Sequence, residues 1–147
     1  MNGLSAKAER LGQAPFEWLD HPGDVKLRAR GSTLQQLFAN AALGMTAYLY
    51  GEEILKAQPE QWQPIEVSAP DLEALLVDWL AELLWRSAAE RRAYCGFVIS
   101  ALNEHRLAGE VGTVPAEAID DVKAVTHHEL SIRQDNNGWE AIVVFDV

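Results

Sequence analysis

A broad apolar stripe with helical spacing runs through residues 72–84. Its members are Leu72, Leu75, Leu76, Trp79, Leu80, Leu83 and Leu84. Because an α-helix makes one turn in about 3.6 residues, this spacing puts all of them on one face. Pro70 and Asp71 come just before, and both residue types favour the start of a helix. The stripe needs an apolar surface to pack against, so the rest of the chain has to supply one.

A second helix is predicted over residues 34–49, where apolar residues follow the same period. They are Leu34, Leu37, Phe38, Ala41, Ala42, Met45 and Leu49. Ser32 precedes this segment and Gln35 follows three residues later, which is the pattern of a capping box. The helical pattern fades at Tyr50 and Gly51.

Period-two alternation predicts strands on both sides of the helices. The expected strands cover residues 16–19, 25–30, 65–69, 97–102, 106–111, 122–128 and 140–147, with a further strand ahead of the turn at 135–138. In residues 25–30 the cations Lys26, Arg28 and Arg30 should face outward, and Asn137-Gly138 suits a type I′ turn. Two helices against a mainly antiparallel sheet make an α+β domain over residues 16–147, preceded by a flexible tail over residues 1–15.

Composition narrows the classes of function. The 147 residues are 48% hydrophobic, which is typical of one globular domain with a substantial core. The net charge of −10 disfavours direct binding to nucleic-acid phosphates, so a role in RNA chemistry should run through a protein partner. The single cysteine, Cys95, is expected to be inert and suits a reducing compartment. With no secretory signal and no membrane-spanning apolar run, we expect a cytoplasmic protein.

The stretch of residues 120–128 carries most of the reactive side chains. Two carboxylates lead into a β-prone segment with one lysine, Lys123, and the segment ends in His127 and His128. If residues 122–128 form one strand, Lys123 and His127 share a face and His128 lies on the other. We expect one of the two histidines to be exposed and the other to be packed.

The last strand, residues 140–147, has apolar side chains on both faces, so it should be largely buried. Asp146 lies at its end. A buried carboxylate needs a cation, hydrogen-bond donors or a metal, because an unpaired buried charge costs several kcal/mol at least. An ion pair with Lys123 would satisfy Asp146 as well as a metal would. Asp24 lies in the turn at residues 20–24, where Asp is common for backbone reasons alone. A zinc site at the paired histidines has little support, because the ligand spacing is unconstrained.

The sequence resembles the archease family over nearly the whole of residues 16–147. Four segments carry the resemblance: Phe16-Glu17-Trp18-Leu19-Asp20-His21 with Asp24-Val25; Thr33-Leu34 with Asn40-Ala41-Ala42-Leu43-Gly44-Met45; Asp71-Leu72-Glu73-Ala74-Leu75-Leu76 with Asp78-Trp79-Leu80 and Glu82-Leu83-Leu84; and Val122-Lys123-Ala124-Val125-Thr126 with His128, followed by Asp146-Val147. The chain departs from the family at Pro22-Gly23, where Thr-Ala is usual, and at His127, where an aromatic residue is usual.

The resemblance implies a protein cofactor with no turnover of its own. Such a protein binds the tRNA-splicing RNA ligase, speeds its guanylylation and lets it turn over repeatedly in tRNA splicing or RNA repair. The resemblance also implies a divalent metal, calcium, held by Asp24, Asp146 and Val147, and it places the functionally required lysine at Lys123. His21 and His128 are expected to be neighbours of this site. Hard divalent cations prefer several oxygen ligands, which these carboxylates would supply.

Two other functions compete with this reading. One is a metal-dependent hydrolase that uses Asp24, Asp146 and a histidine base. Against it, no general base stands at a defined spacing from the acids. The other is a general chaperone-like binding module. Unspecific binding requires neither Lys123 nor a metal cluster, and the sequence has no obvious exposed apolar stretch.

Overall fold

The computed structural model describes residues 15–19 and 23–147. The tail predicted over residues 1–15, apart from Pro15, and the predicted site neighbour His21 therefore lie outside the described residues. The elements follow in the order β1 (Phe16–Leu19), β2 (Val25–Gly31), α2 (Leu34–Tyr50), the 3₁₀ helix η1 (Glu52–Lys56), β3 (Gln61–Ser68), α3 (Leu72–Glu90), β4 (Arg92–Leu102), β5 (Arg106–Pro115), β6 (Ala124–Val125), β7 (Ser131–Asp135) and β8 (Gly138–Asp146).

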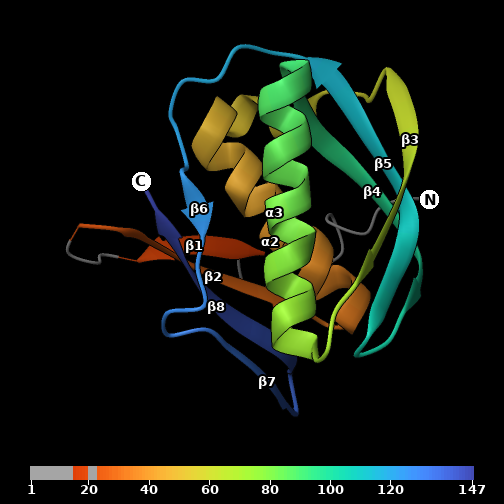
Figure 1. Ribbon diagram of the computed structural model, residues 1–147, viewed down its shortest axis with the longest axis vertical. Coiled ribbons are helices and arrows are strands. Elements are labelled where there is room, and N and C mark those ends of the chain that lie inside the picture. The colour runs from red at the N-terminus through yellow and green to blue at the C-terminus, as the bar shows by residue number, and fades with distance from the viewer. Residues whose placement is uncertain (1–14, 20–22) are drawn as a thin grey trace.

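The strands form two antiparallel sheets, and the helices pack between and beside them (Figure 1). One sheet has the order β1-β2-β8-β6, with β7 also paired to β8, and the other has the order β3-β5-β4. The predicted α+β class with two helices is confirmed. The sequence predicted a single sheet, and the structure has two. Strand periodicity does not say which strands pair.

Helix α3 forms where the apolar stripe predicts it. The Asp71 side chain accepts a 2.8 Å hydrogen bond from the amide of Ala74, as expected of an N-cap residue. Trp79 is fully buried, and its indole N–H donates a 2.9 Å hydrogen bond to the carbonyl of Phe38 in α2. The two helices are therefore joined by a buried polar contact as well as by apolar packing. No helix in the described part of the chain is long and apolar enough to cross a membrane.

Helix α2 is buried over most of its length and contacts strands of both sheets. Two of its polar side chains are buried and hydrogen-bonded, Asn40 to the carbonyl of Arg30 and Thr46 to the carbonyl of Tyr94. The predicted capping box at Ser32 is wrong by one residue. Thr33 is the N-cap and accepts from the amide of Gln36, because β2 continues to Gly31 and leaves Thr33 as the first residue free to cap.

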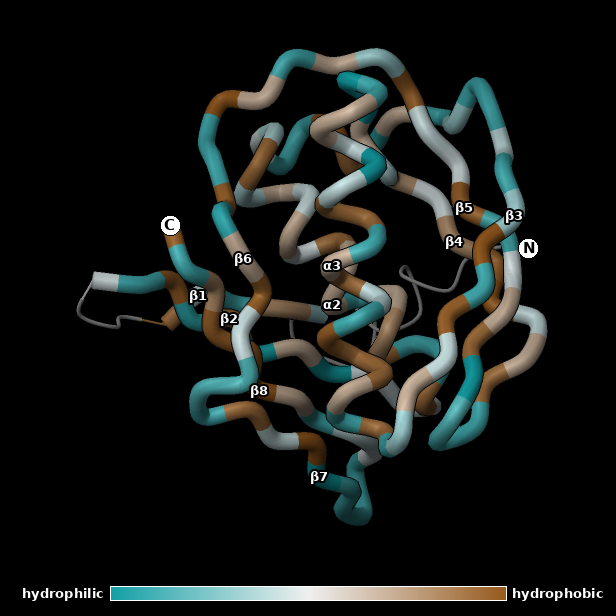
Figure 2. Tube along the Cα trace, viewed as in Figure 1, coloured by the Kyte–Doolittle hydropathy of each residue, from teal (hydrophilic) through white to brown (hydrophobic). Residues whose placement is uncertain are grey.

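Strands β3, β4 and β5 are longer than the sequence predicts, and one turn differs in type. Strand β3 begins at Gln61 instead of Ile65, because the pairing with β5 extends to the polar residues ahead of the apolar ones. In the β7–β8 hairpin, Asp135 pairs with Gly138, so the turn residues are Asn136 and Asn137. Only Gly138 has a positive φ there, of 123°, whereas a type I′ turn needs positive φ at both central residues. The predicted type I′ turn is therefore wrong. Figure 2 shows the hydrophilic character of this turn.

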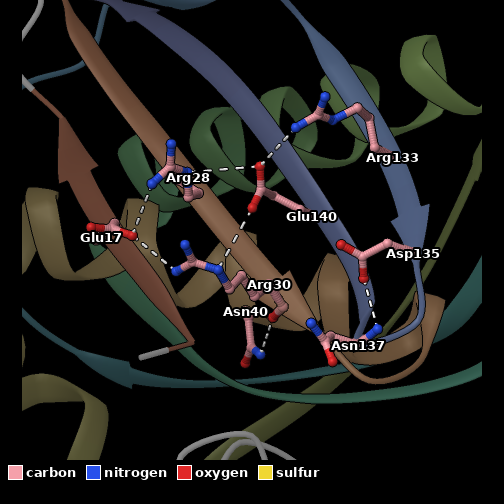
Figure 3. Close-up of polar contacts among 8 residues, drawn as sticks. All are labelled: Glu17, Arg28, Arg30, Asn40, Arg133, Asp135, Asn137 and Glu140. Carbon is pink, nitrogen blue, oxygen red and sulfur yellow. Dashed lines mark hydrogen bonds and ion pairs between the residues drawn. The ribbon is translucent and has the colours of Figure 1, made fainter. Parts of the chain in front are cut away.

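The outer face of the five-stranded sheet carries a ladder of alternating charges (Figure 3). Glu17 contacts Arg28 at 3.3 Å and Arg30 at 2.9 Å, and Glu140 lies 3.8 Å from Arg28, 3.6 Å from Arg30 and 3.8 Å from Arg133. The predicted outward direction of Arg28 and Arg30 is confirmed. The hydrogen bond from Arg30 lowers the pKa of Glu17, and the Arg28 guanidinium adds to this, while desolvation opposes it.

Candidate functional site at the end of strand β8

Three segments that are distant in sequence meet at the end of β8. Val25 at the start of β2 pairs with Phe145, and Ala124 in β6 pairs with Asp146. Asp24 directly precedes Val25, and Lys123 directly precedes Ala124. The pairing thus brings Asp24, Lys123 and Asp146 to the same end of the sheet, with β8 in the middle. Figure 1 shows the C-terminus beside β6 at this edge.

Asp146 is exposed, which contradicts the prediction of a buried carboxylate. The strand itself is buried as expected, with Val143 and Phe145 fully inside the core. Asp146 follows Phe145 and therefore points to the opposite face, where its side chain is exposed at the end of the strand. Its carboxylate is solvated, so burial does not force it to find a cation.

Lys123 is also exposed. Its backbone N–H donates a 2.8 Å hydrogen bond to the carbonyl of Asp146. Within the described ranges, neither the Lys123 ammonium nor the Asp146 carboxylate has an ion-pair partner within 4.0 Å, so the alternative of a buried pair between them is wrong. The backbone of Lys123 is thus held at the strand end, and its ammonium is open to solvent.

The predicted strand over residues 122–128 is much shorter in the structure. Strand β6 contains only Ala124 and Val125. Thr126 then bonds the carbonyl of Val144 through both its amide and its hydroxyl. The Thr126 hydroxyl also accepts from the amide of His128, and Glu129 adopts a positive φ of 55°. These contacts turn the chain out of the sheet before the histidines.

Both histidines lie in that turn and both are exposed, so the prediction that one of them is packed is wrong. His128 Nε2 lies 3.3 Å from Glu129 Oε2, and Glu129 also accepts a 2.7 Å hydrogen bond from Lys26. His128 is thus placed among surface charges beside β6. The tight turn separates it from the line of Lys123 and Asp146.

The described residues supply oxygen donors at this end of the sheet but not a ready-made metal cage. Asp24 is half-buried and Asp146 is exposed. Across residues 15–19 and 23–147, no three acidic, histidine or cysteine side chains lie close enough together to hold a metal ion. Carboxylates from neighbouring strand ends still match the oxygen preference of hard divalent cations.

An aromatic cluster that the sequence did not predict packs against Phe145, the residue before Asp146. Trp18 on β1 lies 5.3 Å from Tyr48 of α2 and 6.0 Å from Phe145, between ring centroids. Burial raises the pKa of the Tyr48 hydroxyl, and the nearby carboxylate of Asp120 adds to the shift. The cluster therefore connects β1, β8 and α2 beneath Asp146. Nothing in the local sequence pattern could have joined three rings so far apart.

Comparisons with known proteins agree on one family. The sequence profile of the Archease protein family matches residues 16–147. A protein archease of Methanosarcina barkeri is 33% identical over 144 residues, which span 90% of this chain and 95% of that protein. The solution structure of Methanobacterium thermoautotrophicum protein 1598 superposes with a TM-score of 0.75 at 28% identity, covering 90% of this chain and 99% of that one. A Thermotoga maritima archease described as a possible chaperone shares the fold, with a TM-score of 0.60 at 17% identity over 88% of this chain and 94% of its own. This chain belongs to the Archease protein family.

Proposed function

We propose that this protein is a non-catalytic activator of a tRNA-splicing RNA ligase. It binds the ligase, accelerates the guanylylation of the ligase and supports repeated turnover in tRNA splicing or RNA repair. Membership of the Archease family supports a role of this kind. The net charge of −10 also favours a protein partner over direct contact with RNA.

The observation that carries the proposal is that Lys123 is exposed while its backbone is hydrogen-bonded to Asp146. An exposed ammonium with no ion-pair partner in the described part of the chain contributes little to stability where it stands. Its backbone is nevertheless held by the hydrogen bond to Asp146, so the stem of the side chain starts from an ordered position. An exposed cation on an ordered stretch of backbone, with no ion-pair partner among the described residues, is suited to meet a carboxylate or a phosphate group of the ligase.

A divalent cation, calcium, is part of the same proposal. Asp24, Asp146 and Val147 would hold it, since the β2–β8 pairing brings the first two to neighbouring strand ends. The cation would offset the repulsion between these carboxylates and order the end of β8 beside Lys123. Binding of this kind stabilises the folded state by mass action.

A metal-dependent hydrolase is less well supported than an activator. That function would need a base near the two acids, and His128, the only one of the two predicted neighbours among the described residues, lies beyond the turn at Thr126. We therefore expect the purified protein to turn over neither GTP nor RNA ends by itself.

The test is a guanylylation assay of the cognate ligase with and without the protein, followed by RNA joining under conditions of multiple turnover. Guanylylation should be faster with the protein present, and each ligase molecule should complete many joining cycles. Equal rates in both arms would refute the proposal. GTP hydrolysis by the protein alone would point to an enzyme instead.

A general chaperone-like activity is the second candidate, because the structure exposes large apolar side chains that the sequence did not reveal. Trp85 is 68% exposed and Ile119 is 72% exposed. The related Thermotoga maritima protein is described as a possible chaperone. Suppression of the aggregation of unrelated unfolded proteins, without any effect on ligase guanylylation, would favour this candidate.

A further inference from the structure

A groove runs from the C-terminal half of α3 to Lys123, and its volume is about 480 Å³. Helix α3 forms one wall, the end of α2 forms the floor, and residues 118–125 form the other wall. The residues that matter here are Leu84, Trp85 and Ala88 on the helix, and Asp120, Asp121 and Lys123 opposite. This volume falls in the range of pockets that hold several side chains of a ligand.

The apolar wall is dominated by Trp85, which is 68% exposed. Small residues, Ala81 and Ala88, flank it on the groove side and leave its ring accessible. Leaving so large an apolar ring in water is unfavourable, and Trp is the residue type most enriched in the energetic centres of protein interfaces.

The opposite wall is acidic and rigidly held. The amides of Ile119 and Asp120 donate to the carbonyl of Leu49 at 2.7 Å and 3.3 Å, which ties the wall to the last turn of α2. Asp120 and Asp121 both line the groove, and neither has an ion-pair partner among the described residues. In Figure 2 this segment is hydrophobic, then hydrophilic, then hydrophobic again as it descends into β6.

From this arrangement we infer that the groove is the docking site for a segment of the partner ligase that presents an apolar side chain to Trp85 and a lysine or arginine to Asp120 and Asp121. The inference rests on the proposed function. Charge complementarity selects the occupant, because two carboxylates without an ion-pair partner among the described residues attract a basic peptide and repel a nucleic-acid backbone. Since Lys123 closes one end of the groove, a partner seated there lies directly beside the candidate site.

Docking and activation are then carried by different residues, which an activation assay can separate. Trp85→Ala should raise the concentration of the protein needed for half-maximal guanylylation, with the maximal rate kept. Loss of a central interface Trp raises Kd by about thirtyfold. Lys123→Ala should do the reverse and lower the maximal rate with little change in the half-maximal concentration.

The matched control is Trp62→Ala, since Trp62 is 47% exposed but lies on β3 of the other sheet. It should leave ligase affinity unchanged. Trp85→Phe, which keeps an aromatic ring, should restore most of the affinity. A double variant, Asp120→Asn and Asp121→Asn, should weaken ligase binding by about tenfold and make that binding less dependent on salt concentration. The control double variant, Glu60→Gln and Glu104→Gln, should change neither the affinity nor its salt dependence.

Affinity of Trp85→Ala equal to that of the wild type, with a normal melting temperature, would overturn the inference while leaving the proposed function standing. Wild-type protein that neither binds nor activates the ligase would overturn both. Light scattering of the protein alone supplies a further check. A wild-type dimer that Trp85→Ala converts to a monomer would make a second copy the occupant and overturn the inference as stated.

Discussion

The backbone amide of Lys123 is hydrogen-bonded to the carbonyl of Asp146 at 2.8 Å, although their side chains form no ion pair. The contact fixes where both side chains begin, and leaves the ends of both in solvent. Two residues of opposite charge are thus joined through their backbones, without direct contact between their charged groups. That arrangement suits residues that act on a partner more than residues that stabilise the fold.

Lys123→Ala should therefore fold normally and fail to activate. Exposed charges contribute roughly 0–1 kcal/mol to stability, so the melting temperature should change little. Charge reversal to Glu should impair activation more than Ala if the target on the ligase is anionic. Lys56→Ala is the control, since Lys56 is a highly exposed lysine whose ion pair within the described residues is with Glu53. A large fall in melting temperature with full activation per folded molecule would show that Lys123 is only structural.

Asp24→Ala and Asp146→Ala should each weaken calcium binding and reduce activation. Asp146 is exposed, so its loss should not unfold the chain. After chelation, calorimetric titration with calcium should give a weaker Kd for each variant than for the wild type, and calcium should raise the melting temperature of the wild type. Asp78→Ala on α3 is the control. Unchanged affinity in both variants would remove these residues from the site.

Trp79→Ala should destabilise the protein strongly, because Trp79 is completely buried between the helices and the three-stranded sheet. Removing a large buried ring typically costs about 3–5 kcal/mol. Trp79→Phe keeps most of the volume but loses the hydrogen bond to Phe38, so roughly 1–3 kcal/mol is expected. Urea denaturation measures both. A cost for Ala no larger than that for Phe would mean that the helices repack around the cavity.

Glu17→Gln should make stability less dependent on acid pH. The folded-state pKa of Glu17 is held below its ordinary value, by the Arg30 hydrogen bond above all. Its contribution is therefore present at neutral pH and is lost as the pH falls through the lowered pKa. Since the side chain is 40% exposed, solvent screening limits the contribution to about 1 kcal/mol or less. Urea midpoints should separate wild type and variant at pH 7 and converge in strong acid, with Glu60→Gln as control. A gap that persists in acid would contradict this origin.

Cys95 should react slowly with thiol reagents in the native protein. Burial raises the pKa of its thiol, and the thiolate is the reactive form. The thiol also lies 3.8 Å from the carbonyl of Ala57. Disulfide-exchange reagents at pH 8 should modify it rapidly only after denaturant is added. Fast reaction of the folded protein would show that β4 opens readily at this point.

The sequence alone predicted those features that depend on residues close together in the chain. The stripe ending in Leu84 predicts α3, and Asp71 caps it, because helical hydrogen bonds and caps join residues a few positions apart. Outward arginines on β2 follow from alternation for the same reason. The resemblance to the archease family, carried by short motifs in order, was confirmed by the comparisons.

The tertiary structure decided what depends on residues distant in sequence. Asp146 is exposed at the end of the strand, which alternation within β8 does not reveal. Strand β6 stops at Val125, and the chain then turns away where the Thr126 hydroxyl accepts from the amide of His128 and Glu129 has a positive φ. Asp24, Lys123 and Asp146 meet only through the pairing of β2 and β6 with β8. Trp85 lines a groove only because residues 120–125 fold against α3. Such placements arise from long-range packing, in which each contact is selected by the burial of the whole core and not by its neighbours in sequence.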